Sequence, residues 1–159
     1  MSLKLTSSAF RDGDSIPDKY SKLGGNASPP LAWSGIPGSA KSLALIVDDP
    51  DAPSGLFVHW VVYGIPTNMD EFPENLPAKA ELPRGIRQGR NGFGDVGYGG
   101  PQPPRGTHRY FFHLYALNQD IQLPAGASRE DLDKAMRGHI VEEARLMGTF
   151  QHRTGSHVG

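Results

Sequence analysis

The 159-residue sequence contains no cysteine, which excludes disulfide bonds, thiolate nucleophiles and cysteine-ligated zinc or iron–sulfur sites. It has almost no excess charge, since 16 basic and 17 acidic residues leave a formal net charge of −1. That balance removes the broad electrostatic argument for binding nucleic acid or an anionic membrane. The sequence also lacks both a run of about 18 apolar residues and the start of a signal peptide. We therefore expect a soluble, cytoplasmic protein with no transmembrane segment.

Glycine and proline are, by contrast, abundant, with 20 and 14 residues. Their combined share stays below that of low-complexity disordered chains, so it indicates many turns and ordered loops. The length suits one globular domain. We expect residues 1–150 to form this domain and residues 151–159 to form a polar C-terminal tail.

Three segments are rich in β-branched and aromatic residues and stop at turn-forming residues, as β-strands do. They span residues 42–47, 57–65 and 108–117. All three are apolar on both faces, which is typical of central strands that are covered on both sides. Weaker strand signals lie at residues 3–5 and 31–33.

One helix is predicted near the C-terminus, beginning after Ser128, because this serine can cap a helix and apolar residues follow it at helical spacing. The apolar stripe continues to a natural stop at Gly148 and comprises Leu132, Met136, Ile140, Ala144 and Met147. A single clear helix after a series of strands opposes a βαβ parallel fold. The sequence therefore predicts a mainly β protein, an antiparallel sandwich with a peripheral helix.

Two motifs resemble cofactor sites but lack the context that such sites need. Residues 92–97 match the GxGxxG pattern of dinucleotide-binding proteins, but a run of glycine and proline follows, in which no helix can begin. His108 and His113 have a spacing found in zinc fingers, but their odd separation on a strand sends them to opposite faces. We therefore expect no cofactor and no metal at these motifs.

Charge is uneven along the chain despite the overall balance. Residues 84–109 contain five arginines and a single acid, Asp95. Two interpretations stay open at this point: solvated loops in which the arginines cluster by chance, and a mildly positive rim near an anion site.

A small polar pocket is predicted from strand parity. His108 and Tyr110 are two residues apart and project from the same face of one predicted strand. They follow a glycine- and proline-rich loop at residues 99–106, whose glycines expose backbone N–H groups. The strand that carries His59 likewise follows a proline-restricted acidic turn at residues 49–53. A lone histidine is more typical of a satisfied structural residue, but two polar-ended strands beside rigid loops favour one shared pocket.

The sequence around this predicted pocket resembles that of a known family. Residues 49–53 read Asp-Pro-Asp-Ala-Pro and precede His59-Trp60, and residues 100–110 read Gly-Pro-Gln-Pro-Pro-Arg-Gly-Thr-His-Arg-Tyr. Both stretches closely resemble the phosphatidylethanolamine-binding protein (PEBP) family, of which the prokaryotic, Raf-kinase-inhibitor-like branch fits best. The resemblance extends from about Phe10 to Phe150.

The resemblance implies a sandwich of two antiparallel sheets with peripheral helices and one small pocket for phosphate-like anions, including phosphoethanolamine headgroups. Carried over residue by residue, this pocket is lined by Asp49, Pro53, His59, Gly100, His108 and Tyr110. We add Asp51, from the same acidic turn, as a candidate ligand-binding residue. The short connection between Pro53 and His59 and the C-terminal end differ from eukaryotic members, so no kinase target or other protein partner is carried over.

The predicted pocket combines donors that suit a phosphate with aspartates that would repel one. An aspartate in such a place either orients a histidine and favours its protonated form, or receives the ammonium of a zwitterion such as phosphoethanolamine. Both arrangements favour a binding protein for a phosphate-like anion or phosphoethanolamine headgroup over an enzyme.

Two other function classes stay open. Asp49, His59 and His108 match the two-histidine, one-carboxylate pattern of a metal-dependent hydrolase, and with Tyr110 they match an acid–base enzyme that needs no metal. A regulatory or inhibitor module would instead dock a protein partner at the pocket edge. The sequence identifies neither the partner nor the physiological ligand.

Two structural details are also expected. The turn before the second central strand is tight, and tight reversals are where cis X–Pro bonds occur, so Ala52–Pro53 is predicted to be cis. A homodimer is predicted through an exposed subset of four aromatic residues: Trp33, Trp60, Phe93 and Phe111.

Overall fold

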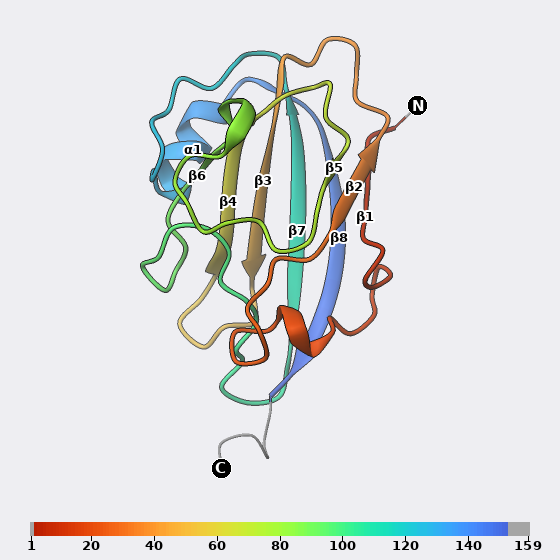
Figure 1. Ribbon diagram of the computed structural model, residues 1–159, viewed down its shortest axis with the longest axis vertical. Helices are drawn as coiled ribbons and strands as arrows, with labels where there is room; N and C mark the ends of the chain where they lie inside the picture. The colour runs from red at the N-terminus through yellow and green to blue at the C-terminus, as the bar shows by residue number, and fades with distance from the viewer. Residues whose placement is uncertain (1, 153–159) are drawn as a thin grey trace.

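The computed structural model describes residues 2–152, which form eight β-strands, one α-helix and two short 3-10 helices (Figure 1). The strands are β1 (Lys4–Thr6), β2 (Leu31–Ser34), β3 (Ser42–Asp49), β4 (Phe57–Ile65), β5 (Glu71–Phe72), β6 (Arg87–Gln88), β7 (Thr107–Leu117) and β8 (Ile140–Gln151). The helix α1 spans Arg129–Met136, and the 3-10 helices are η1 (Asp18–Tyr20) and η2 (Pro83–Gly85).

The strands form two antiparallel sheets, as the sequence predicts. One sheet has the order β1-β2-β5, and the larger one has the order β6-β4-β3-β7-β8. β3 lies at the centre of the larger sheet, and all eight of its residues are buried. Its apolar run, Leu43 to Val47, is therefore covered on both faces, which explains why it shows no polar alternation.

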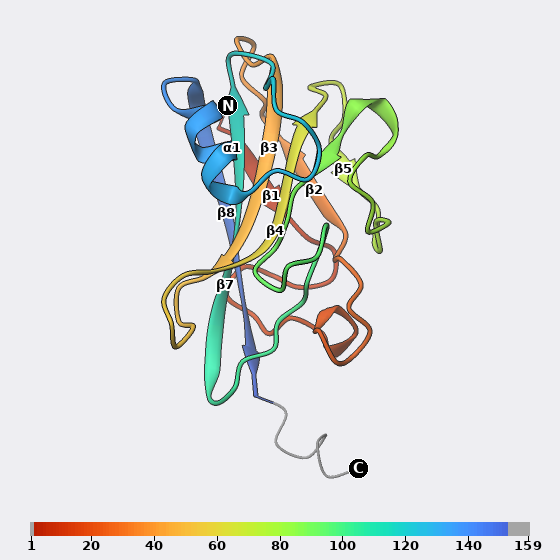
Figure 2. The same ribbon diagram turned by 90° about the vertical axis from the view of Figure 1, so that its left-hand side faces the viewer.

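Two apolar clusters cover the two faces of the larger sheet. The larger cluster fills the space between the sheets and includes Trp33, Trp60 and Phe112. The smaller cluster lies between the larger sheet and α1, and includes Tyr63 and Leu132. Figure 2 shows the resulting layers, with α1 on one side of the larger sheet and β1, β2 and β5 on the other.

The predicted strands all form: β2, β3, β4 and β7 contain their predicted segments, and β1 begins one residue later than predicted, at Lys4. Two of the four aromatic residues predicted to form a homodimer contact are, however, not exposed. Trp33 is 4% exposed and Trp60 is 0% exposed, so both tryptophans belong to the core and not to an exposed contact face.

The helix near the C-terminus forms but is shorter than predicted. Ser128 caps it as expected, accepting a hydrogen bond from the N–H of Asp131 at 3.1 Å. It ends at Met136, a turn follows with Gly138 at φ 81°, and the rest of the predicted helical stripe lies on β8. A spacing of four fits both a helical face and one face of a strand, so Ile140 and Ala144 satisfy either pattern. Pairing with β7 along almost its whole length decides in favour of the strand.

The predicted C-terminal tail is described only in its first two residues. Of the predicted tail, Gln151 ends β8 and the N–H of His152 donates to the carbonyl of Gly106, whereas residues 153–159 lie outside the described residues.

None of the helices within residues 2–152 has the length and apolarity needed to cross a membrane.

Candidate functional site

Two consecutive aspartates at the end of β3 face opposite sides of the larger sheet. Asp49 points to the side of the smaller sheet, where its Oδ2 lies 2.7 Å from Nδ1 of His108. Asp48 points to the side of α1, where its Oδ1 lies 3.1 Å from Nε2 of His113. Strand parity therefore separates the two histidines as the sequence predicts, and each has its own buried carboxylate.

A β-bulge in β4 directs His59 to the same side as His108. β3 pairs Val47 with Trp60 and Asp48 with Val58, so His59 is the extra residue that has no partner across the ladder. A bulge re-aims a side chain without ending the strand. The His59 ring is consequently buried at an edge-on angle to the Tyr110 ring, with the centroids 5.1 Å apart.

The hydrogen bond of His59 fixes which ring nitrogen carries the proton. Nδ1 lies 2.6 Å from the carbonyl oxygen of Gly99, and because a carbonyl only accepts, Nδ1 is the donor. Burial lowers the pKa of His59, outweighing the opposite effects of this carbonyl and of the nearby carboxylates. The ring is therefore neutral at pH 7, and its Nε2 offers a lone pair and not an N–H.

Tyr110 holds a buried hydroxyl that has no hydrogen-bond partner within residues 2–152. The backbone of Gln102 lies near it but outside hydrogen-bond geometry. Burial, and next the charge of Asp49, raise the pKa of Tyr110 far above its usual value. The hydroxyl thus keeps its proton and remains a donor, and a buried donor without a partner is costly unless a ligand or water satisfies it.

These groups surround one cavity of about 340 Å³ between the β3–β4 turn and the loop before β7. It is lined by Asp49, Ala52, Pro53, Ser54, Phe57, His59, Phe93, Gln102, Pro103, Pro104, His108 and Tyr110. We call this cavity the Tyr110 pocket. Its walls are largely apolar, and its polar groups converge from three strands and two loops. Within residues 2–152, no group of three His, Asp or Glu side chains is placed to hold a metal ion.

Five of the seven predicted site residues line the Tyr110 pocket: Asp49, Pro53, His59, His108 and Tyr110. Asp51 does not, because its carboxylate accepts hydrogen bonds from the backbone N–H, Nε and Nη2 of Arg109. These bonds lower the pKa of Asp51 to about 2. Asp51 therefore ties the β3–β4 turn to β7 from a position outside the pocket lining.

Gly100 also has a structural position and does not line the pocket. Its N–H donates to Oδ1 of Asn26 at 2.7 Å, so this amide is already used. A Cβ at position 100 would overlap the backbone of Tyr20 and Ser21. Glycine is thus required here for close backbone packing, and not for the ligand-facing N–H that the sequence suggested.

The Ala52–Pro53 peptide bond is trans, so the prediction of a cis bond is wrong. No peptide bond within residues 2–152 is cis. The turn closes by side-chain hydrogen bonds instead. Oδ1 of Asp49 accepts the N–H of Asp51 at 2.7 Å, which is an Asx turn. Together with the Asp51–Arg109 pairing, this turn reverses the chain without a cis bond.

Phe57 and Phe93 line the pocket but were not predicted from the sequence. Their rings meet edge-on with centroids 4.8 Å apart, and both also pack edge-on against His59. Phe93 sits in a loop that Asn91 holds through its side-chain oxygen and nitrogen. An aromatic residue between two loop glycines, Gly92 and Gly94, is the sequence signal that points to Phe93 as a pocket residue.

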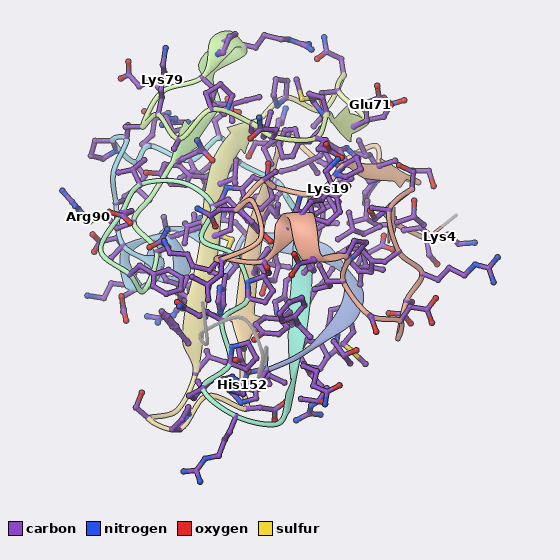
Figure 3. The ribbon with its side chains drawn as sticks, turned by 60° about the horizontal axis from the view of Figure 1, so that its bottom comes forward. Lys4, Lys19, Glu71, Lys79, Arg90 and His152 are labelled. Carbon is purple, nitrogen blue, oxygen red and sulfur yellow. The ribbon has the colours of Figure 1, made fainter. Side chains whose placement is uncertain are left out.

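The arginines of residues 84–109, whose role the sequence left open, do not gather on one surface. Arg109 is paired with Asp51, and Arg90 projects outward from the side of the molecule in Figure 3. Arg84 and Arg87 line a cavity elsewhere in the fold. The sequence cluster of arginines is therefore dispersed by the turns that separate them.

On the other face of the sheet, His113 lies between two carboxylates. Its Nδ1 is 3.0 Å from Glu143 and its Nε2 is 3.1 Å from Asp48, which also contacts Arg129. Burial opposes the charged form, but these two carboxylates outweigh it and raise the pKa of His113 above 6.5. The protonated ring thus stabilises the fold.

This raised pKa predicts a pH-dependent loss of stability. The contribution of His113 is fully present below the unfolded pKa of about 6.5 and is lost as pH rises through the higher folded pKa. Urea unfolding at several pH values should show that the stability difference between the wild type and His113→Gln shrinks as pH rises above neutrality. A difference that grows with pH would contradict the proposed charge state.

Comparison with known proteins finds a matching family model and related sequences. A family model described as "Phosphatidylethanolamine-binding protein" matches residues 6–151. A UPF0098 protein of Methanothermobacter thermautotrophicus is 51% identical over 94% of this chain and 99% of its own length. UPF0098 protein PH1269 of Pyrococcus horikoshii is 46% identical over 96% of this chain and 78% of its own length.

Two solved structures share the fold. A putative PEBP homolog from Chlamydia trachomatis has a TM-score of 0.87 and 41% identity, covering 96% of this chain and 99% of that one. The Escherichia coli protein YbcL, described as a new member of the mammalian PEBP family, has a TM-score of 0.89 and 31% identity. That match covers 96% of this chain and 100% of YbcL. On this evidence, the chain belongs to the phosphatidylethanolamine-binding protein family.

Proposed function

We propose that the Tyr110 pocket binds the phosphate group of a small phosphoester of the phosphoethanolamine type, and that the protein acts by binding and not by catalysis. The observation that carries this proposal is the buried Tyr110 hydroxyl, which has no hydrogen-bond partner within residues 2–152 yet lines the cavity. A phosphate oxygen supplies the acceptor that this donor lacks.

His108 is the second phosphate contact. Asp49 holds its Nδ1, which leaves Nε2 as the ring nitrogen available to the cavity. When Nε2 carries a proton, the ring is an imidazolium that donates a charge-assisted hydrogen bond, and the Asp49 carboxylate balances its charge. Asp49 is thereby a positioning residue, which lines the pocket and holds the His108 ring through its carboxylate.

His59 has a different role from the one that its sequence position suggests. Because its Nδ1–H is committed to Gly99 and the neutral form is favoured, Nε2 accepts a hydrogen bond. Its natural partners are the ammonium of a zwitterion and the hydroxyl of a singly protonated phosphate. The site therefore suits a zwitterionic phosphoester better than a fully ionised phosphate.

The expected affinity is modest. A few charge-assisted hydrogen bonds contribute roughly 1.5–3 kcal/mol each, and the cost of association offsets much of that sum, which gives micromolar to millimolar binding. The pocket volume of about 340 Å³ suits a headgroup.

Tyr110→Phe tests whether the Tyr110 hydroxyl binds the phosphate. The substitution removes a hydroxyl that has no protein partner, so the free energy of unfolding should stay the same or rise slightly. Phosphoethanolamine binding, measured by calorimetric titration, should weaken by roughly tenfold because the phosphate loses one hydrogen bond.

The matched control is Tyr98→Phe, whose hydroxyl donates to the carbonyl of Tyr20 at 2.7 Å. This variant should lose stability and keep binding, the reverse of Tyr110→Phe. Unchanged binding in folded Tyr110→Phe protein would refute the proposed phosphate contact.

A further inference from the structure

Two arginines at the other end of the sandwich have no ionic partner among the described residues. Arg84 and Arg87 form no ion pair with any carboxylate in residues 2–152, whereas Arg109 and Arg129 are paired with Asp51 and Asp48. Arg84 and Arg87 line a cavity of about 660 Å³, which Gly64, near the end of β4, also lines. An adjoining cavity of about 380 Å³ shares Gly64, Arg84 and Asp120 with it. We call the two together the Arg87 groove.

The Arg87 groove is well separated from the Tyr110 pocket. β3 and β4 pair Leu43 with Ile65 at one end and Asp49 with Phe57 at the other, so the groove and the pocket lie at opposite ends of β4. Along the strand this is on the order of 20 Å. In Figure 1, η2, the short green helix near the top, marks the groove, and the turn that joins β3 to β4, at the bottom, marks the pocket.

The guanidinium of Arg87 is held in place without being neutralised. Its Nη1 donates to the carbonyl of Leu123 at 2.6 Å, and its Nε donates to the carbonyl of Gly85 at 3.2 Å. The group also stacks over the Tyr63 ring, 5.4 Å from the centroid. Nη2 makes no hydrogen bond with the part of the chain that the structure describes, and it lies against Gly64, where any Cβ would collide with it. Glycine at position 64 thus gives the guanidinium the space that it occupies, and both residues line the cavity.

Arg84 is placed beside this group by an uncommon backbone conformation. Its φ is 68°, in the left-handed region that non-glycine residues rarely adopt, and its Nη2 donates to Oδ1 of Asn68. That amide orients the guanidinium without neutralising it. The left-handed conformation costs free energy, and its persistence in a residue whose charge is unpaired motivates a functional interpretation.

We propose that the Arg87 groove is a second anion-binding site, which takes a compact oxyanion such as a phosphate or a carboxylate group. A planar guanidinium fixed by neutral carbonyls is suited to such groups, because no hydrogen bond to a competing carboxylate has to break. Lys41 adds a third cation, and Glu81 and Asp120 reduce the formal charge of the lining to +1. The two flanking carboxylates disfavour extended polyanions, so the site selects a small group.

Titration of the ¹⁵N-labelled protein with inorganic phosphate, and separately with succinate, tests this proposal. The amides of Gly64 and Gly85 should shift on a saturation curve that is independent of the curve for Gly99 beside the Tyr110 pocket. Arg87→Gln and Arg84→Gln should each weaken the groove curve by about tenfold or more and leave the pocket curve unchanged. His108→Gln should do the reverse. A response to phosphate alone, or to succinate alone, identifies which oxyanion the groove prefers.

The control for general charge is Arg11→Gln, which removes an exposed cation in the segment after β1. It should leave both curves unchanged. Because Arg87 also supports local structure, Arg84→Gln, at an exposed residue, keeps the test interpretable if Arg87→Gln unfolds. The proposal is overturned if neither anion shifts the groove amides, or if Arg84→Gln and Arg11→Gln affect the groove curve equally.

Discussion

His108→Ala is expected to weaken phosphoethanolamine binding by roughly ten- to hundredfold, corresponding to about 1–3 kcal/mol. Two effects act in the same direction. The phosphate loses the charge-assisted bond from Nε2, and the Asp49 carboxylate, now without its partner at 2.7 Å, faces the ligand as an uncompensated negative charge. Calorimetric titration of the purified variant measures the loss.

A second variant distinguishes a loss of ligand affinity from a loss of folding stability. His108→Gln keeps an amide donor for Asp49, so it should fold more stably than His108→Ala while still lacking the cationic contact. His113→Ala is the matched control, because it removes a half-buried histidine that also bonds a β3 aspartate but faces away from the pocket. If His113→Ala abolished binding and His108→Ala did not, the site assignment would be wrong.

Trp60→Ala is expected to cost about 3–5 kcal/mol of unfolding free energy, the largest stability effect that we predict. The indole is fully buried, and its Nε1 donates to Oε1 of Gln88 at 2.7 Å. Gln88 in turn donates to the carbonyls of Pro77 and Lys79, so one side chain links β4, β6 and the segment before η2. Removal of the ring leaves a cavity and an unsatisfied amide oxygen together.

Chemical denaturation measures this cost, and Trp60→Phe resolves its components. Phenylalanine refills most of the cavity but cannot donate to Gln88, so we expect a smaller loss of about 1–3 kcal/mol. A loss below about 1 kcal/mol for Trp60→Ala would contradict the central packing role of this residue.

The parts of the fold that local chemistry determines could be predicted from the sequence. The apolar, β-branched run from Leu43 to Val47 indicates a strand buried on both faces, and this prediction is confirmed. Parity on β7 correctly separates His108 from His113, because a strand without a bulge between them keeps its alternation. The family resemblance is confirmed by the family model and the relatives.

Features that depend on tertiary pairing were not predictable in this way. The Ile140–Ala144 spacing fits helix and strand equally, and only the presence of β7 selects the strand. The bulge that aims His59 is invisible in the sequence because it reflects a register shift against β3. The donor direction of His59 depends on Gly99, forty residues away. Gly100 likewise gains its packing role from residues 20–22, which are remote in the chain.

The most direct test of the central claim is a crystal structure of the protein grown with phosphoethanolamine. We predict the phosphate in the Tyr110 pocket, with one oxygen within hydrogen-bond distance of Tyr110 Oη, another near His108 Nε2, and the ammonium toward His59 Nε2. Phosphoethanolamine bound elsewhere, with the Tyr110 hydroxyl satisfied by water alone, would contradict the account.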